Sequence, residues 1–401
     1  MAAIRRSLWR TLITWMRVVL PPWWTVTLFV AGLIGCELLA HFFMYRIADW
    51  DGLQFHKNAL LLHQPRDTWL AVGLVMYGCY RVGAMHPFFR PEYAEWLGQT
   101  PWSGRLPLPL GPVYLVPQDA VIFLLAWLVS LDTSKFGFHA LVVLFLLPYL
   151  VALIAPLRVM DATAHAYLIA YGLAAAVWLG LPSPNATLVL IALCFVAWHG
   201  LPTSLNGFAW NVAPMLWEHL SPMMRFKRNS AALSKPLGYP FAQLSPRPEF
   251  MAISSREALL LSWLAACWLW ALASNIPDGQ ERAKVCIVVA IAGILVSALG
   301  RSLAYFLEYR PPISLLGRLV TGQWIIPGHD RAWLPIGCAV LVAIATMLTS
   351  SHFPGSIIGP LALGLGLTLL LGMPPRLRDW ALTGNHRIVA NTSRRNEFIE
   401  L

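Results

Sequence analysis

Long apolar runs separated by short polar or proline-rich segments recur along almost the whole chain. Each run approaches the roughly 20 residues that a helix needs to cross the hydrocarbon core of a bilayer. The pattern therefore predicts an all-α integral membrane protein with about ten transmembrane helices. The expected spans are residues 24–45, 68–87, 114–131, 138–157, 163–181, 186–203, 258–276, 284–306, 333–350 and 356–373.

These spans divide into two membrane bundles, residues 23–203 and residues 258–374. Residues 204–257 are too polar and proline-rich to cross a bilayer, so we expect them to form a long cytoplasmic loop. Residues 375–401 are expected to form a basic cytoplasmic tail. Within the first bundle, the stretch "PEYAEWLGQ" predicts a short cytoplasmic helix near 91–99. A proline opens this stretch, an acidic residue follows in the first turn, and a glycine lies near its end.

The opening stretch, "MAAIRRSLWRTLITWMRVVLPPWW", has a different pattern. Arg6, Arg10 and Arg17 share one side of a helix, and apolar side chains occupy the other side. We expect residues 1–22 to form an interfacial amphipathic helix whose basic face meets anionic lipid headgroups. The alternative is that residues 8–20 only lengthen the first span.

Composition and charge support the membrane class and add an orientation. Hydrophobic residues make up 58% and charged residues 12% of the 401 positions, whereas soluble domains carry about 25% charge. With ten spans and a cytoplasmic N-terminus, 23 basic residues fall in cytoplasmic segments and 6 in outer segments. This bias follows the positive-inside rule and predicts a plasma (inner) membrane protein with both termini cytoplasmic. The arginine-rich composition is typical of a bacterial source.

The net charge of +10 raises the question of whether the protein binds nucleic acid. No nucleic-acid-binding motif accompanies the charge, so we expect the lipid bilayer, and not nucleic acid, to be the partner of the basic residues. The six cysteines lie in apolar stretches without a CxxC motif, so neither a disulfide framework nor a metal site is expected.

Ionisable residues at membrane depth are costly and therefore mark candidate sites. Glu37 and His41 lie four residues apart, so they share a face of the first span. We expect the Glu37 carboxyl to be protonated or paired, with His41 as the nearest candidate partner. An arginine from another span is the other candidate, although Arg81 and Arg301 both lie towards the inner end of their spans. The candidate intramembrane polar residues are Glu37, His41, Arg81, His86, Asp119, Asp161, His165, His199 and Arg301.

Four interpretations of these residues stay open. They could line a polar pathway for a solute, with Glu37 as its central charge. Two of His41, His86, His165 and His199 could ligate a haem, although the chain has no CxxCH motif and no cofactor is otherwise expected. They could form a lipid-facing active site, for which no catalytic residue is assigned. Finally, Arg81 with Asp119 or Asp161, and Glu37 with His41, could be buried pairs that lock helices together.

The chain contains no P-loop, HExxH or GxSxG motif, so it lacks the sequence features of a nucleotide-driven motor, a zinc protease or a serine hydrolase. Residues 1–131 are expected to form an N-terminal interfacial helix, membrane spans and a short cytoplasmic helix. This order of elements is similar to that of permeases of exporters whose ATPase is a separate chain, although ten spans depart from their usual six. The resemblance implies a permease-like or complex-forming subunit that works with a separate ATPase or with other membrane subunits. The alternatives are a membrane-embedded enzyme or haem protein, and a structural subunit of a membrane assembly.

Overall fold

The chain forms two compact units, Met1–Pro214 and Met215–Leu401. The boundary falls inside residues 204–257, where the sequence predicts the long loop. The computed structural model describes residues 16, 19–48, 64–100, 102, 106, 108–130, 137–159, 162–206, 244–245, 255–308, 319–322, 324, 333–353, 355–372 and 389–390. Arg6, Arg10, Arg17 and Asp161 lie outside the described residues, as do most of residues 1–22 and 204–257 and nearly all of 375–401.

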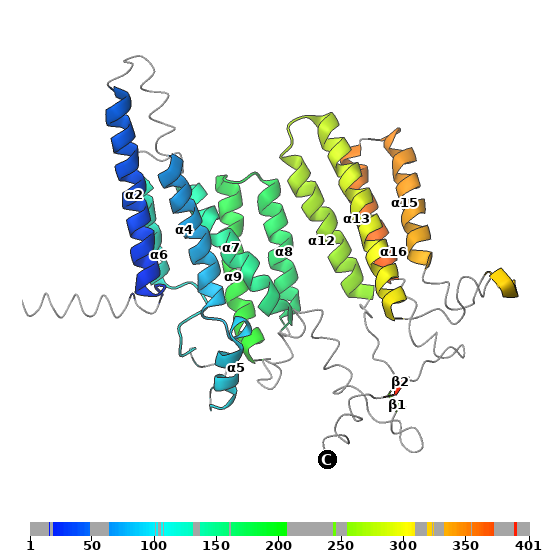
Figure 1. Ribbon diagram of the computed structural model, residues 1–401, viewed down its shortest axis with the longest axis horizontal. Helices are drawn as coiled ribbons and strands as arrows, with labels where there is room; N and C mark the ends of the chain where they lie inside the picture. Colours follow the sequence, from blue (N-terminus) through cyan, green and yellow to red (C-terminus); the bar gives the residue numbers. More distant parts are fainter. Residues whose placement is uncertain are drawn as a thin grey trace, which may run out of the picture. The chain divides into compact units, whose positions relative to one another are not determined.

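The first unit is a helical bundle built around one apolar helix. Its described elements are α2 (Trp23–Ala48), α4 (Gln64–Gly83), η1 (Pro87–Phe89), α5 (Pro91–Gly98), α6 (Pro117–Ser130), α7 (Phe138–Val159), α8 (Thr163–Trp178) and α9 (Pro184–Asn206). Helix α7 packs against α4, α6, α8 and α9 (Figure 1). A helix that is apolar all round is suited to such a central place, and Leu141, Leu150 and Leu153 on α7 are fully buried.

Helix α2 packs on α4 through two aromatic rings that lie over glycines. Trp69 of α4 lies over Gly32 of α2, and Phe29 of α2 lies over Gly73 of α4, so a Cβ at either glycine would collide with the opposing ring. The two rings stack with centroids 6.3 Å apart, and the Trp69 Nε1–H donates to the Phe29 carbonyl at 3.0 Å. Many other apolar side chains of α2, including Leu38, are exposed.

The second unit contains four described helices: α12 (Ser255–Ser274), α13 (Gly279–Glu308), α15 (Leu334–Ser350) and α16 (Gly355–Gly372). The glycine-rich helix α16 contacts the other three (Figure 1). At Gly359 the α16 backbone comes so close to α13 that a Cβ would lie 2.6 Å from the Cys286 carbonyl carbon. Ile294, Ala339 and Leu363 belong to the core between these helices. Strands β1 (Leu244–Ser245) and β2 (Val389–Ala390) pair antiparallel.

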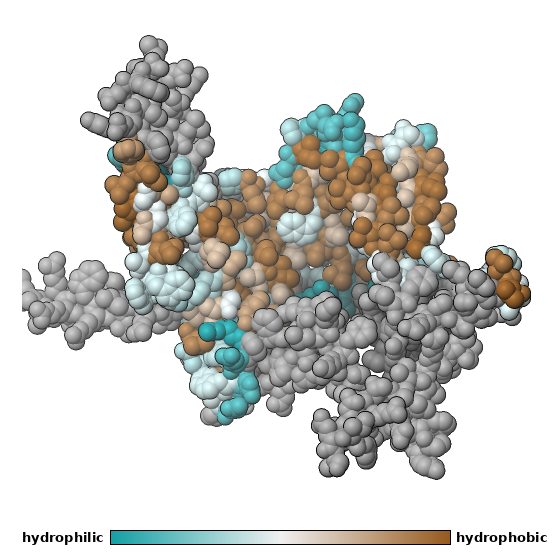
Figure 2. All heavy atoms as spheres, in the orientation of Figure 1, coloured by the Kyte–Doolittle hydropathy of each residue, from teal (hydrophilic) through white to brown (hydrophobic). Residues whose placement is uncertain are grey.

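The protein is a helical membrane protein. Five described helical segments are long and apolar enough to cross a bilayer: Trp23–Phe42, Phe138–Arg158, Pro184–Asn206, Ser255–Ser274 and Gly279–Ser302. Pro117–Ser130, Thr163–Trp178, Leu334–Ser350 and Gly355–Leu371 are shorter apolar helices. Figure 2 shows hydrophobic side chains over the visible faces of α13 and α15, with hydrophilic residues gathered at the α12–α13 turn. A helix occupies most of each predicted span, but ten crossings and their orientation remain predictions.

Helix boundaries correct several predicted edges. The predicted span 68–87 is the helix Gln64–Gly83, which stops before His86. The predicted span 284–306 begins earlier, at Gly279, because the Asp278 carboxylate accepts a hydrogen bond from the Gln280 N–H at 2.9 Å and caps the helix. Helix α5, Pro91–Gly98, lies in the range where the sequence predicts a short helix.

Candidate functional site

A buried ion pair joins α4 to the first turn of α6. Arg81 is fully buried and Asp119 is 4% exposed. The Arg81 Nε lies 2.9 Å from Asp119 Oδ1, and its Nη2 donates to Oδ2 at 3.3 Å. The Tyr77 hydroxyl donates to Oδ1 at 2.7 Å, and the Val116 N–H donates to Oδ2 at 2.8 Å. Because Tyr77 and Arg81 are four residues apart on α4, one helix face delivers both side chains to the carboxylate.

The backbone that leads into α6 is not helical, and the same buried network holds it. Residues 111–116 precede the helix, which begins at Pro117. The Arg81 Nη2 donates to the Tyr114 carbonyl at 3.1 Å, and the Tyr149 hydroxyl of α7 donates to the Val113 carbonyl at 3.1 Å. Non-helical backbone at membrane depth is tolerated only where protein buries it or where it lines a water-filled cavity. Here Arg81 and Tyr149 supply donors to two of its carbonyl groups.

Helix α6 is itself short for a crossing. Its 14 residues give a length of about 21 Å, against a hydrocarbon thickness of about 30 Å. The predicted span 114–131 is therefore a short helix preceded by non-helical backbone, and Arg81 and Asp119 lie at the junction between the two. Sequence reasoning placed Arg81 and Asp119 among the possible buried pairs, and the structure brings these two together.

Some buried polar atoms on α4, on the turn that follows it and on α6 make no hydrogen bond. Among the described residues, the Arg81 Nη1, the His86 Nε2 and the Gln118 Oε1 are buried without a hydrogen-bond partner. The Arg81 Nε is close to Asp119, but its N–H is not directed for a hydrogen bond. The His86 Nδ1 accepts the Phe88 N–H at 3.1 Å and caps η1, so His86 is neutral there. An unpaired buried polar atom is costly, so the Arg81 Nη1, beside the ion pair with Asp119, marks the junction as a candidate site.

A second polar cluster joins α2 to the start of α4. Glu37 Oε2 lies 3.4 Å from Arg66 Nη1, and Arg66 Nη2 donates to Asp67 Oδ1 at 3.4 Å. His41 Nδ1 is 2.9 Å from the Glu37 backbone carbonyl and 3.8 Å from its carboxylate. Arg66 of α4 is thus the arginine from another helix that pairs with Glu37, and neither Arg81 nor Arg301 does so in the described residues. Sequence reasoning missed Arg66 because it assigned this residue to the loop before the second span.

We expect the Glu37 cluster to be structural. Replacing Glu37 with glutamine should lower the free energy of unfolding by no more than about 1 kcal/mol, because the Glu37 side chain is one-third exposed and solvent weakens the pair. Replacing Arg66 with methionine should cost more, about 1–3 kcal/mol, because Asp67 and Glu37 lose the arginine that they share. Thermal unfolding in detergent measures both changes. A Glu37→Gln variant that inserts and folds normally but loses activity would instead place Glu37 on a functional pathway.

The remaining sequence candidates do not join either cluster in the described part of the chain. His165 of α8 packs on Gly200 of α9, where a Cβ would lie 2.8 Å from the His165 Cβ. His199 is exposed on α9, and Arg301 is partly buried on α13. No group of three or more potential metal ligands occurs among the described residues. Haem ligation therefore stays a prediction that no observation tests.

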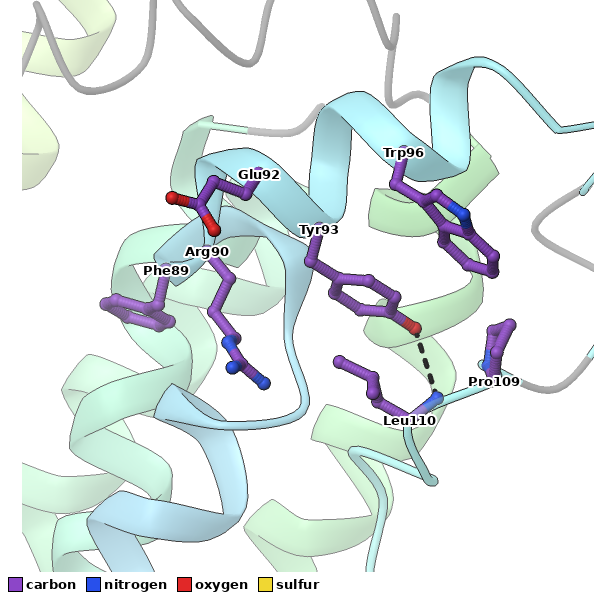
Figure 3. A pocket seen from close by; sticks show the side chains of 7 residues that line it. All are labelled: Phe89, Arg90, Glu92, Tyr93, Trp96, Pro109 and Leu110. Carbon is purple, nitrogen blue, oxygen red and sulfur yellow. Dashed lines mark hydrogen bonds between the residues drawn. The ribbon is translucent and has the colours of Figure 1, made fainter.

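A surface pocket lies beside α5, which sequence reasoning expected as a helix but not as the wall of a pocket. The pocket has a volume of about 530 Å³. Tyr93 stacks on Trp96 with ring centroids 6.1 Å apart, and its hydroxyl accepts the Leu110 N–H at 3.4 Å (Figure 3). Burial raises the pKa of the Tyr93 hydroxyl above its usual value. The lining residues are Phe89, Arg90, Glu92, Tyr93, Trp96, Pro109 and Leu110, and we call this site the α5 pocket.

No known protein family, curated protein or solved structure matches this chain.

Proposed function

We propose that the protein is a permease-like membrane subunit that forms a complex with a separate energy-supplying chain. In this proposal it crosses the inner membrane ten times, with both termini in the cytoplasm. The observation that carries the proposal is the junction at α6, where non-helical backbone meets a buried Arg81–Asp119 pair whose Arg81 Nη1 has no hydrogen-bond partner.

The non-helical backbone at the start of the short helix α6 supports a transport role. Transporters commonly build their solute sites where a helix ends within the membrane, from backbone groups and nearby charges. In this chain the Tyr114 carbonyl and the Val116 N–H take part in the same network as Arg81 and Asp119. The chain carries no P-loop motif, so we assign energy supply to a partner.

A structural subunit is the second candidate, and one observation favours it. Both carboxylate oxygens of Asp119 are occupied within the protein, by Tyr77, Arg81 and the Val116 N–H. A network closed in this way can lock α4 to α6 without serving any solute. The two functions differ in whether water reaches the junction from one side of the membrane.

Cysteine labelling at the junction tests this difference. In a background where all six free cysteines are replaced, we would compare Gln118→Cys with the matched control Leu124→Cys on the same helix. Gln118 has a buried polar oxygen near the junction, whereas Leu124 is an exposed apolar residue. A permease should let a charged, membrane-impermeant thiol reagent modify the Gln118→Cys variant from one side of the membrane, and leave the Leu124→Cys variant unmodified. If the Gln118→Cys variant is inert from both sides while the protein is folded, the pair is a structural lock and the permease proposal is wrong.

A further inference from the structure

Helix α5 lies outside the segments that are long and apolar enough to cross a membrane, yet it exposes a large aromatic side chain. Trp96 is 49% exposed, and Leu110, which faces it across the α5 pocket, is 43% exposed. Exposed apolar side chains that gather in a pocket are typical of a binding surface. The same helix also exposes Glu92 and Glu95, and Figure 2 shows hydrophilic residues gathered over it.

The α5 pocket has a polar end and an apolar end. Figure 3 shows Phe89, Arg90 and Glu92 on one side of Tyr93, Trp96 and Pro109 on the other, and Leu110 beneath the Tyr93 ring. The Arg90 side chain points away from the Glu92 carboxylate, and its Nη1 donates to the Ala84 carbonyl at 3.2 Å. Glu92 is exposed, so an external cation can reach its carboxylate. An elongated ligand with a cationic part and an apolar part fits this division.

The pocket is held in shape before anything binds. Tyr93, Ala94 and Leu97 are the buried face of α5. The hydrogen bond between the Leu110 N–H and the Tyr93 hydroxyl ties the opposite wall to the helix. A preformed pocket of this kind loses little conformational entropy when a ligand binds. Even a small contact area can therefore contribute to binding affinity.

Charge decides which kind of partner suits the pocket. The chain as a whole has a net charge of +10, whereas the exposed face of α5 presents two carboxylates, Glu92 in the pocket and Glu95 on the next turn of the helix. One arginine, Arg90, also lines the pocket, and its Nη1 is bonded to the Ala84 carbonyl, so the two acids outnumber it. Glu92 and Glu95 repel anionic lipid headgroups and attract basic side chains. We propose that the α5 pocket is the docking site for a basic amphipathic segment of a partner protein. One apolar side chain of that segment lies between Trp96 and Leu110, and its lysine or arginine residues lie against Glu92 and Glu95.

This inference rests on the proposed complex-forming role, because it names the surface that receives the partner. The pocket is small compared with a stable interface, because seven residues line it, whereas each partner of a standard interface contributes about 20–30 residues. A contact of this size suits a transient or regulated association, or one part of a larger interface. Trp96 is its expected anchor, because tryptophan is among the residues that most often carry binding energy at interfaces.

Photo-cross-linking in the native membrane tests the proposal on the full-length chain. A benzophenone side chain would be placed at Leu110, on the wall that faces Trp96. We expect an adduct with another polypeptide, whose cross-linked segment is basic and amphipathic. The double variant Glu92→Lys/Glu95→Lys should reduce this adduct about tenfold, because like charges then face each other. The matched control Glu281→Lys removes an exposed acid of α13, far from the pocket in sequence, and should leave the adduct unchanged.

Charge reversal on the partner completes the test. Replacing the basic residues of the cross-linked segment with glutamate should restore the adduct to the Glu92→Lys/Glu95→Lys variant and remove it from the unmodified chain. Adducts with lipid only, adducts within the chain itself, or an adduct that ignores both charge reversals would each overturn the proposal. The labelling of the Gln118→Cys variant is measured separately, so a chain that labels there but forms no such adduct would keep its permease role and lose only this docking site.

Discussion

Replacing Arg81 with methionine is expected to cost about 3–5 kcal/mol of stability, the loss typical of breaking a buried ion pair from one side. Asp119 is 4% exposed and would keep only the Tyr77 hydroxyl and the Val116 N–H as donors. The Tyr114 carbonyl would also lose its Arg81 donor, so the backbone leading into α6 would be weakened. The loss is measured as the shift in thermal or denaturant unfolding of the protein in detergent.

Two further variants separate the ion pair from a general effect of losing an arginine. Arg90→Met removes an exposed arginine whose contact is a hydrogen bond to the Ala84 carbonyl, and it should change stability by less than about 1 kcal/mol. The double variant Arg81→Met/Asp119→Leu removes both buried charges and should recover most of the stability, because no uncompensated buried charge remains. A double variant no more stable than Arg81→Met would contradict this account.

Adding one methyl group at Gly359 is the second change with a large expected effect. A Cβ there would lie 2.6 Å from both the carbonyl carbon and the carbonyl oxygen of Cys286, so Gly359→Ala must push α16 away from α13. Overpacking of this kind costs about 1–3 kcal/mol. The contact is with backbone atoms, which no side-chain rotation can relieve, so we expect the upper part of that range.

Gly300→Ala is the matched control on α13, because nothing lies within 4 Å of the added Cβ. Alanine is a better helix former than glycine by about 0.5–1 kcal/mol, so this variant should be neutral or slightly stabilising. Both variants are compared by thermal unfolding in the same detergent. Equal melting temperatures for the two would show that α13 and α16 do not approach as closely as described.

The apolar runs of the sequence predict where most helices lie, because length and hydropathy alone decide which segments suit a bilayer. They do not distinguish a helix from buried non-helical backbone. Tyr114, Leu115 and Val116 are as apolar as a helix turn, so the sequence extends the third span over them. The signal that marks the true start is Pro117, since proline is favoured in the first turn of a helix.

Long-range contacts were harder to predict than helices. The pairing of Arg81 with Asp119 was one of several possibilities, because charge and depth alone allowed Asp161 as well. The pairing of Glu37 with Arg66 was missed, because the start of α4 lies earlier than hydropathy indicates. The α5 pocket depends on the hydrogen bond between Leu110 and Tyr93, 17 residues apart, for which the local sequence has no signal.

The attachment of α2 to α4 has a consequence for how the protein is made. The aromatic rings on the two glycines and the Glu37–Arg66 pair all join α2 to residues 66–73. A ribosome releases α2 first, so these contacts form only after α4 has been synthesised and inserted. Until then α2 is held in the bilayer by its own apolar surface. Docking of α2 onto α4 therefore requires α4, and a chain stopped before residue 66 would leave α2 without these partners.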